Sequence, residues 1–290
     1  MFGKNFKKQK IRTPEVEINT VWGGKGEPVL LLHGYPQTHV MWHAVGRTLA
    51  SNFLVVCPDL RGYGDSSKPA GKKDHSNYSK RAMAADMVSV MEVLGFREFY
   101  AAGHDRGARV LHRMCLDHPE KVLKACVMDI APTHYMFKTA DKRFATGYYH
   151  WFFLIQPDGL PEKMIGADPE YYLLEKLKRW SALGAKFHPE AVKEYVRCFS
   201  DPSAIHASCE DYRAASSIDI VHDEEDMDTK ITCPLLALWG GKGFIHKTYD
   251  VLDVWRKKAL SVSGKPLDCG HFLPEEKPRE TSSELLSFFG

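Results

Sequence analysis

The sequence predicts an α/β fold, in which a doubly wound and mostly parallel sheet carries an inserted helical cap. Three observations lead to this prediction. The 290 residues fit one large domain that contains an insertion. Apolar runs of strand length alternate with helical patterns in the first half of the chain and return near its end. Between them, residues 133–222 show helical patterns without strand signals.

Four continuous apolar runs in the first half are typical of strands buried on both faces of a parallel sheet. They cover residues 28–34, 53–59, 98–105 and 123–130. Between the second and third runs, residues 79–94 place methionine, valine and leucine side chains at helical spacing, and Gly95 supplies a stop. This alternation predicts the doubly wound sheet.

The strand pattern stops after Pro132 and returns at residues 233–240, and a last helix is expected at residues 279–289. We therefore expect a core whose two parts flank the cap: residues 1–132, residues 133–222 as the cap, and residues 223–290. Ligands of such sheets bind outside the carboxyl ends of the strands. The connections to the cap are expected above those ends.

The short sequence "WGGKG" occurs twice, at 22–26 and at 239–243. Neither copy has the glycine spacing and the serine or threonine of a phosphate-binding loop. We expect the first copy to form a hairpin turn and the second a loop at the end of a strand.

The composition points to a small-molecule partner. Lysine and arginine number 39 against 37 aspartates and glutamates, which is unlike the basic surface of a nucleic-acid-binding protein. No signal peptide and no apolar run of membrane-spanning length is present, so a soluble cytoplasmic protein is expected. The seven cysteines are scattered, and we interpret them as reduced thiols. No metal-binding pattern occurs, and neither metal nor cofactor is expected.

The segment "GHDRG" at 103–107 follows a predicted strand and precedes an apolar helical pattern. This is the context of a nucleophile elbow, with Asp105 where the more common version has serine. At a helix N-terminus, backbone N–H groups would stabilise the charged carboxylate. The alternative is that Asp105 only caps the helix.

A carboxylate nucleophile forms an ester with an alkyl group, and water must then cleave this ester with the help of a base. His271, in "CGHF", follows in the expected chain order of nucleophile, acid and histidine. The acid is expected to be Asp129 at a strand end, with Asp268 and Asp250 as weaker choices. The backbone N–H groups of Tyr35 and Arg106 are candidates for an oxyanion hole.

The motifs "HGYPQ", "PDLRGYGDSSKP", "GHDRGARV" and "CGHF" span residues 33–271 and resemble the α/β-hydrolase superfamily, in its haloalkane dehalogenase and epoxide hydrolase branch. Within that branch the chain is most similar to the fluoroacetate (haloacetate) dehalogenases. The resemblance implies an α/β-hydrolase fold, a homodimer, and a halide-binding trio. The trio comprises His150, Trp151 and Tyr212. Without the resemblance, these three side chains would be read as packing of the cap.

Arg106 and Arg109 lie beside the elbow at a spacing that places both at the start of one helix. Two guanidiniums there can clamp a small carboxylate and direct its α-carbon towards Asp105. The alternative without a function is that both arginines are solvated charges at the surface. A neutral haloalkane or epoxide would leave these arginines without a ligand.

The expected function is therefore hydrolytic dehalogenation of short 2-haloacids, above all fluoroacetate to glycolate and fluoride. An epoxide hydrolase is the main alternative, since it uses the same aspartate nucleophile and activates its substrate with two cap tyrosines. Tyr212 fits one of them, but His150 and Trp151 stand where the other is expected. The third hypothesis is a noncatalytic protein that binds a small carboxylate.

Overall fold

The computed structural model describes residues 1–290 and contains one sheet of eight strands in the order β1-β2-β4-β3-β5-β6-β7-β8. Strands β1 and β2 pair antiparallel, β2 pairs antiparallel with β4, and all remaining pairs are parallel. The strands are β1 (Phe6–Arg12), β2 (Glu17–Gly24), β3 (Pro28–Leu32), β4 (Leu54–Pro58), β5 (Phe99–His104), β6 (Val122–Met128), β7 (Leu235–Gly240) and β8 (Val262–Leu267). The predicted α/β fold is confirmed.

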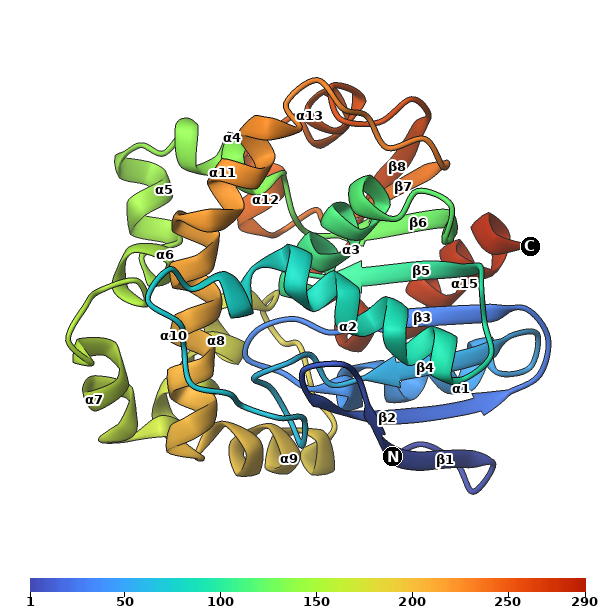
Figure 1. Ribbon diagram of the computed structural model, residues 1–290, viewed down its shortest axis with the longest axis horizontal. Coiled ribbons are helices and arrows are strands. Elements are labelled where there is room, and N and C mark those ends of the chain that lie inside the picture. Colours follow the sequence, from blue (N-terminus) through green and yellow to red (C-terminus); the bar gives the residue numbers. More distant parts are fainter.

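The central strands are buried because helices cover both faces of the sheet. Every residue of β3 and β7 is buried, as their continuous apolar runs predict. Figure 1 shows α2 and α3 in front of the sheet, with α1 and α15 behind it. The helices of the core are η1 (His39–Trp42), α1 (His43–Leu49), η2 (Ser76–Tyr78), α2 (Lys80–Val93), α3 (Arg106–Asp117), α12 (Phe244–Thr248), α13 (Val251–Arg256), α14 (Leu273–Glu276) and α15 (Pro278–Phe289).

Helix α2 shows how local sequence sets the boundaries of an element. Ser79 caps its N-terminus by accepting a hydrogen bond from the Ala82 N–H. Met83 and Met87 on its inner face are fully buried. Beyond its C-terminus, Gly95 has φ of 92°, a conformation that glycine adopts without strain.

All helices between β6 and β7 lie together at one side of the sheet. Figure 1 places them on the left, the side towards which the arrowheads of β4 and β5 point. They are α4 (Thr133–Lys138), α5 (Lys142–Gly147), α6 (His150–Phe153), α7 (Leu160–Gly166), α8 (Pro169–Trp180), α9 (Pro189–Phe199), α10 (Pro202–Ser216) and α11 (Ile218–Glu225), hereafter the inserted helices. The boundary expected after residue 222 falls inside α11.

The hairpin expected at residues 22–26 is wrong. These residues end β2 and lead to β3, but β4 lies between these two strands, so β2 and β3 do not pair. Local sequence predicted the turn, whereas the strand order depends on contacts with a later segment. The second "WGGKG" ends β7 and forms a strand-end loop, as expected.

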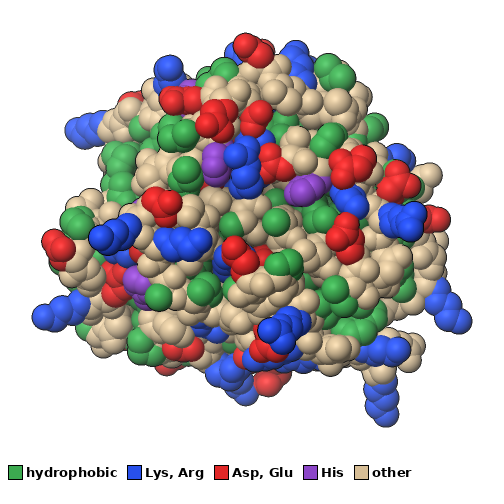
Figure 2. Space-filling model, viewed as in Figure 1, with side chains coloured by type: hydrophobic (Ala, Val, Ile, Leu, Met, Phe, Trp, Pro, Cys, Tyr) green, Lys and Arg blue, Asp and Glu red, His purple; other side chains and the backbone are tan.

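No helix combines the length and the apolar character that a membrane span needs. On the face in Figure 2, basic and acidic side chains are interspersed rather than gathered by sign. This surface agrees with the near balance of charges in the sequence.

Asp59, directly after β4, is a fully buried carboxylate that joins three segments of the core. Its oxygens accept hydrogen bonds from the Asn19 side chain at 2.7 Å and from the backbone N–H of Asp65 at 3.0 Å. They also accept from the backbone N–H and the ring of His39, at 2.8 and 2.7 Å. Burial by itself would raise the pKa of Asp59, but His39 and His33 lower it below its usual range.

We predict that Asp59→Asn lowers the free energy of unfolding by at least about 2 kcal/mol at neutral pH, because an amide nitrogen would face donors that now meet a carboxylate oxygen. Urea unfolding measures this loss. The folded-state pKa lies below the unfolded value of about 3.9, so the contribution of Asp59 is present above that pH and vanishes as the pH falls.

Asp65→Asn is the matched control. The Asp65 carboxylate pairs with Lys8 and Arg197 at the surface, so its loss is expected to cost less than about 1 kcal/mol. Equal losses in the two variants would contradict the role given to Asp59.

Candidate active site

Asp105 lies at the sharp turn between β5 and α3. Its φ of 48° and ψ of −114° are unusual for a residue with a side chain, and such strain is concentrated at functional sites. The turn requires close packing, because a Cβ on Gly107 would collide with the backbone carbonyls of Leu32 and His33 in and beyond β3. The glycine spacing noted in the sequence therefore has a steric cause.

The Asp105 side chain does not cap α3, since it accepts no hydrogen bond from the first turn of that helix. Its Oδ1 instead accepts from the backbone N–H of Tyr35 at 2.9 Å. Gly34 permits this approach, because a Cβ at that position would collide with the Asp105 side chain. The N-cap alternative is thus wrong, and the carboxylate faces the end of the sheet.

Neighbouring basic side chains favour the ionised form of Asp105. Burial by itself would raise the pKa of this carboxyl group, but His271, His104, Arg106 and Arg109 together lower it below its usual value. An ionised carboxylate is the nucleophilic form.

His271 stands between two carboxylates. Its Nδ1 lies 2.6 Å from Asp129 Oδ2, and its Nε2 lies 3.9 Å from Asp105 Oδ2 without a hydrogen-bond partner. The other Asp129 oxygen accepts from the Gly240 N–H at 2.9 Å, which fixes the carboxylate. We infer that Nδ1 carries the proton and that Nε2 presents its lone pair to the site.

The Asp129 contact also changes the basicity of the imidazole. Burial by itself would lower the pKa of His271, but the hydrogen bond and the charge of Asp129 raise it above its usual value. Of the three carboxylates weighed from the sequence, the structure brings only Asp129 to His271. Asp268 pairs with Lys242 at the surface, and Asp250 caps α13.

Arg106 and Arg109 are both buried, so the alternative of solvated surface charges is wrong. Arg106 is engaged by Asp211, which accepts from its Nε at 2.8 Å and from NH2 at 2.7 Å. Only NH1 is left, buried and without a partner. Arg106 can therefore give a substrate carboxylate one nitrogen at most, because its bidentate edge already holds Asp211.

Arg109 has no carboxylate among its hydrogen-bond partners. Its NH1 donates to the backbone carbonyl of Ala131 and to the hydroxyl of Thr133, both at 3.0 Å. Its guanidinium lies 4.7 Å from the centre of a Trp151 ring, and its Nε is buried without a partner. Asp105 supplies a nearby negative charge, but the Nε donor stays unpaired, and an anionic ligand would accept a hydrogen bond from it.

The inserted helices place His150, Trp151 and Tyr212 side by side. The ring centres of His150 and Tyr212 are 5.5 Å apart, and those of Trp151 and Tyr212 are 6.3 Å apart. The His150 Nδ1 and the Tyr212 hydroxyl are buried without partners. Burial lowers the pKa of His150 and raises that of Tyr212, so both side chains are neutral and the phenol keeps its proton.

The sequence interpretation missed two polar groups at this position. The Tyr35 hydroxyl is buried without a partner, and its ring lies 5.4 Å from that of Tyr212. The sequence predicted an oxyanion role for the Tyr35 backbone and a place for Tyr35 in the pocket wall, but no chemistry for its hydroxyl. Asp211 was also missed, since no local pattern marks it except its place beside Tyr212.

A cavity of about 510 Å³ connects the surface with His271. Tyr148, Trp180 and Phe244 supply its aromatic walls. The charged side chains that line it are Arg179, Lys242 and Lys247, all of them cations. Of the candidate site residues, His271 is the one that lines this cavity.

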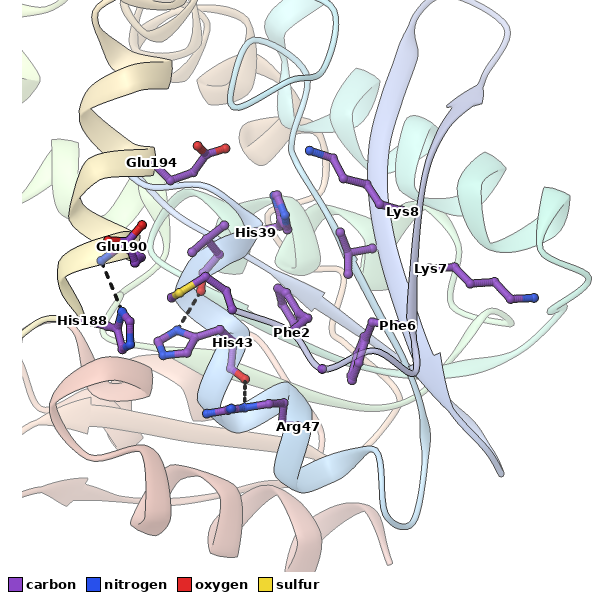
Figure 3. Close-up of a pocket in the computed structure, with 14 residues that line it drawn as sticks. Phe2, Phe6, Lys7, Lys8, His39, His43, Arg47, His188, Glu190 and Glu194 are labelled. Atoms are coloured by element: carbon purple, nitrogen blue, oxygen red, sulfur yellow. Dashed lines mark hydrogen bonds between the residues drawn. The ribbon is translucent and has the colours of Figure 1, made fainter.

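A second cavity, of about 620 Å³, lies near the N-terminus and is shown in Figure 3. Phe2 and Phe6 lie on one side of it, and the rings of His43 and His188 lie on the other. No residue of the candidate site lines this cavity. Across the molecule, no three histidine, cysteine, aspartate or glutamate side chains form a group suited to a metal ion.

Comparisons with known proteins agree with this geometry. The model of a family described as alpha/beta hydrolase fold matches residues 27–278. Over 286 residues, the chain is 45% identical to a Burkholderia sp. protein named fluoroacetate dehalogenase, covering 98% of this chain and 94% of that one. It is 33% identical over 278 residues to a soluble epoxide hydrolase from a Corynebacterium species, with 94% and 93% of the two chains covered.

Solved structures show the same likeness. A crystal structure from Nostoc sp. PCC 7120, assigned by name to the alpha/beta hydrolases, has a TM-score of 0.97 and 60% identity and covers 98% of each chain.

We predict that Asp129→Asn lowers the pKa of His271, because the burial that opposes protonation remains while the carboxylate that favours it is lost. At a pH between the two values, a larger fraction of His271 is then neutral. NMR titration of the ring protons measures the shift. Asp268→Asn, at a carboxylate that does not reach His271, should leave its pKa at the wild-type value; equal shifts in both variants would refute the pairing.

Proposed function

This chain belongs to the alpha/beta hydrolase family, and from that premise we propose that it dehalogenates short 2-haloacids, above all fluoroacetate, by hydrolysis. The observation that carries the proposal is the Arg109 guanidinium. It is buried beside Asp105, no carboxylate is hydrogen-bonded to it, and its Nε has no partner, so a donor remains for one small anion. A carboxylate held there presents its α-carbon to the Asp105 nucleophile.

In the first step, Arg109 and the free NH1 of Arg106 hold the carboxylate of fluoroacetate. Asp105 attacks the α-carbon, a carbon–oxygen bond forms, and the carbon–fluorine bond breaks. Fluoride leaves with the bonding electron pair towards His150, Trp151 and Tyr212. Donors at this position stabilise the developing anion, which the strong carbon–fluorine bond makes necessary.

In the second step, His271 takes a proton from water, and the oxygen attacks the carbonyl carbon of the Asp105 ester. The backbone N–H of Tyr35 already donates to Asp105 Oδ1 at 2.9 Å, and with the N–H of Arg106 it would stabilise the oxyanion. Asp129 stabilises the imidazolium. Glycolate leaves, Asp105 regains its charge, and one proton passes to solvent. The chemistry requires no cofactor.

The relative from Burkholderia supports this substrate class, since it is named for fluoroacetate and is 45% identical. The epoxide hydrolase alternative is supported by the Corynebacterium relative and by the free phenols of Tyr35 and Tyr212, which could protonate an epoxide oxygen. A neutral epoxide has no anionic group to accept a hydrogen bond from the unpaired Nε of Arg109. We therefore favour the haloacid.

We also propose that residues 133–222 act as a cap domain over the site, and that the protein is a cytoplasmic homodimer. The cap-domain proposal is based on the inserted helices, because they carry His150, Trp151 and Tyr212. The proposals of a cytoplasmic location and of a homodimer rest on the resemblance to haloacetate dehalogenases.

We predict that the purified protein releases fluoride from fluoroacetate and that Asp105→Asn abolishes the release, because an amide cannot displace fluoride. An ion-selective electrode measures fluoride directly. His271→Asn should complete only the first step, so that mass spectrometry finds one glycolyl group on the peptide that contains Asp105.

Three outcomes would contradict this proposal. Normal fluoride release by Asp105→Asn would exclude this nucleophile. Hydrolysis of styrene oxide without any turnover of haloacetates would establish the epoxide alternative. Haloacetate binding by the wild-type protein without turnover would indicate a noncatalytic carboxylate-binding protein.

We predict that Arg109→Leu raises the KM for fluoroacetate at least about thirty-fold, because the buried substrate carboxylate loses its charge partner. Steady-state kinetics measure the change. Arg47→Leu removes an exposed arginine that lines the separate cavity of Figure 3 and should keep the wild-type KM. An unchanged KM in Arg109→Leu would exclude Arg109 as a carboxylate ligand.

A further inference from the structure

Asp211, on α10, is a fully buried carboxylate that the mechanism above does not use. It accepts hydrogen bonds from Arg106, from the Tyr63 hydroxyl at 2.7 Å and from the Lys80 ammonium. These donors belong to three different parts of the core: the loop after β4, the start of α2 and the start of α3. One side chain of the inserted helices thus accepts hydrogen bonds from three residues of the core.

We propose that Asp211 is a positioning residue for the substrate carboxylate: it holds the Arg106 guanidinium so that a single nitrogen, NH1, is presented to the substrate. This inference rests on the proposed function and deepens it, because it explains how one of the two arginines is directed.

Hydrogen bonds and ring contacts fix the orientation of the Arg106 guanidinium. Asp211 accepts from Nε at 2.8 Å and from NH2 at 2.7 Å, and its backbone carbonyl accepts from NH2 at 2.9 Å. The Tyr212 ring lies against the guanidinium, 4.2 Å from ring centre to the central carbon. With one edge and one face occupied, NH1 is the nitrogen left for a ligand, and it is buried without a partner.

The charges around Asp211 form a buried network in which two cations meet one carboxylate. Asp211 pairs with both Arg106 and Lys80. Asp219 lies beyond Lys80, where its Oδ1 accepts from the Lys80 backbone N–H at 2.8 Å and its Oδ2 stands 3.6 Å from the ammonium. Burial by itself would raise the pKa of Asp211, but Arg106 and Lys80 hold it below its usual range.

This arrangement connects the subsite proposed for the substrate carboxylate with the subsite proposed for the halide. Asp211 directs the arginine that binds the carboxylate, and its neighbour Tyr212 belongs to the trio proposed for the halide. Because both sit on one turn of α10, the distance between the two subsites is set by a single rigid element. A short 2-haloacid fits such a fixed spacing better than a long one.

The test is Asp211→Asn in the full-length protein, with Asp219→Asn as the matched control. The amide that replaces the Asp211 carboxylate would lack the charge that aligns Arg106, so we expect the KM for fluoroacetate to rise about tenfold or more, with a much smaller change in kcat. Asp219 touches Lys80 but not Arg106, so its variant should keep the wild-type KM. Thermal unfolding of each variant confirms that it is folded.

A wild-type KM in folded Asp211→Asn, or an equal rise in the Asp219 variant, would overturn the proposal. A merely structural role would lower the melting temperature and kcat without this separation of KM from kcat. If Asp211→Asn does not fold, the Tyr63→Phe variant tests the proposal instead. It removes one hydrogen-bond donor to Asp211 and keeps the ion pair between Asp211 and Arg106. We then expect a KM roughly two- to tenfold higher, and an unchanged KM would refute the role.

Calorimetric titration with glycolate separates this inference from the proposed function. If the wild-type protein binds glycolate but releases no fluoride, and Asp211→Asn alone weakens binding, the positioning role stands and the proposed function falls. If fluoride is released but neither KM nor glycolate affinity changes in Asp211→Asn, only the positioning role falls.

Discussion

An ionised carboxylate, Asp105, is buried at the end of a parallel sheet, and the rest of the site depends on this constraint. Transfer of such a charge out of water is costly unless nearby groups compensate it. Here the Tyr35 N–H bonds one oxygen, His271 faces the other, and Arg106 and Arg109 supply positive charge. The same groups that make the buried charge tolerable are those that the proposed reaction uses.

Two of the side chains that compensate the Asp105 charge are themselves held by further buried carboxylates. His271 is fixed by Asp129, and Arg106 is fixed by Asp211. These pairings satisfy one side of each group and leave the other side free. The buried polar atoms that keep no partner include His271 Nε2, Arg106 NH1 and Arg109 Nε. Buried polar atoms are rarely left unpaired in folded proteins, so their presence on three side chains whose charges act on Asp105 marks a site prepared for a ligand.

The core and the inserted helices contribute different parts of the chemistry. The end of the sheet supplies the elbow, the histidine and its acid, which suit any reaction through an aspartyl ester. The inserted helices supply Tyr212 and His150, which we propose for the leaving group, and Asp211, which we propose as the residue that positions Arg106. Relatives named for fluoroacetate and for epoxides share one fold with this chain. We infer that the choice between substrates lies in what the inserted helices bring to Asp105.

The sequence by itself determined the five buried parallel strands β3 to β7, the helix boundaries at Ser79 and Gly95, and the elbow around Asp105, because these features follow from apolar periodicity and backbone sterics over a few residues. It did not predict β1, β2 and β8. The halide trio was reached through resemblance, not through a local pattern. Only the tertiary structure decided that the bidentate edge of Arg106 binds Asp211, 105 positions away. The partner of a buried charge is chosen by packing between distant segments, and no local pattern records that choice.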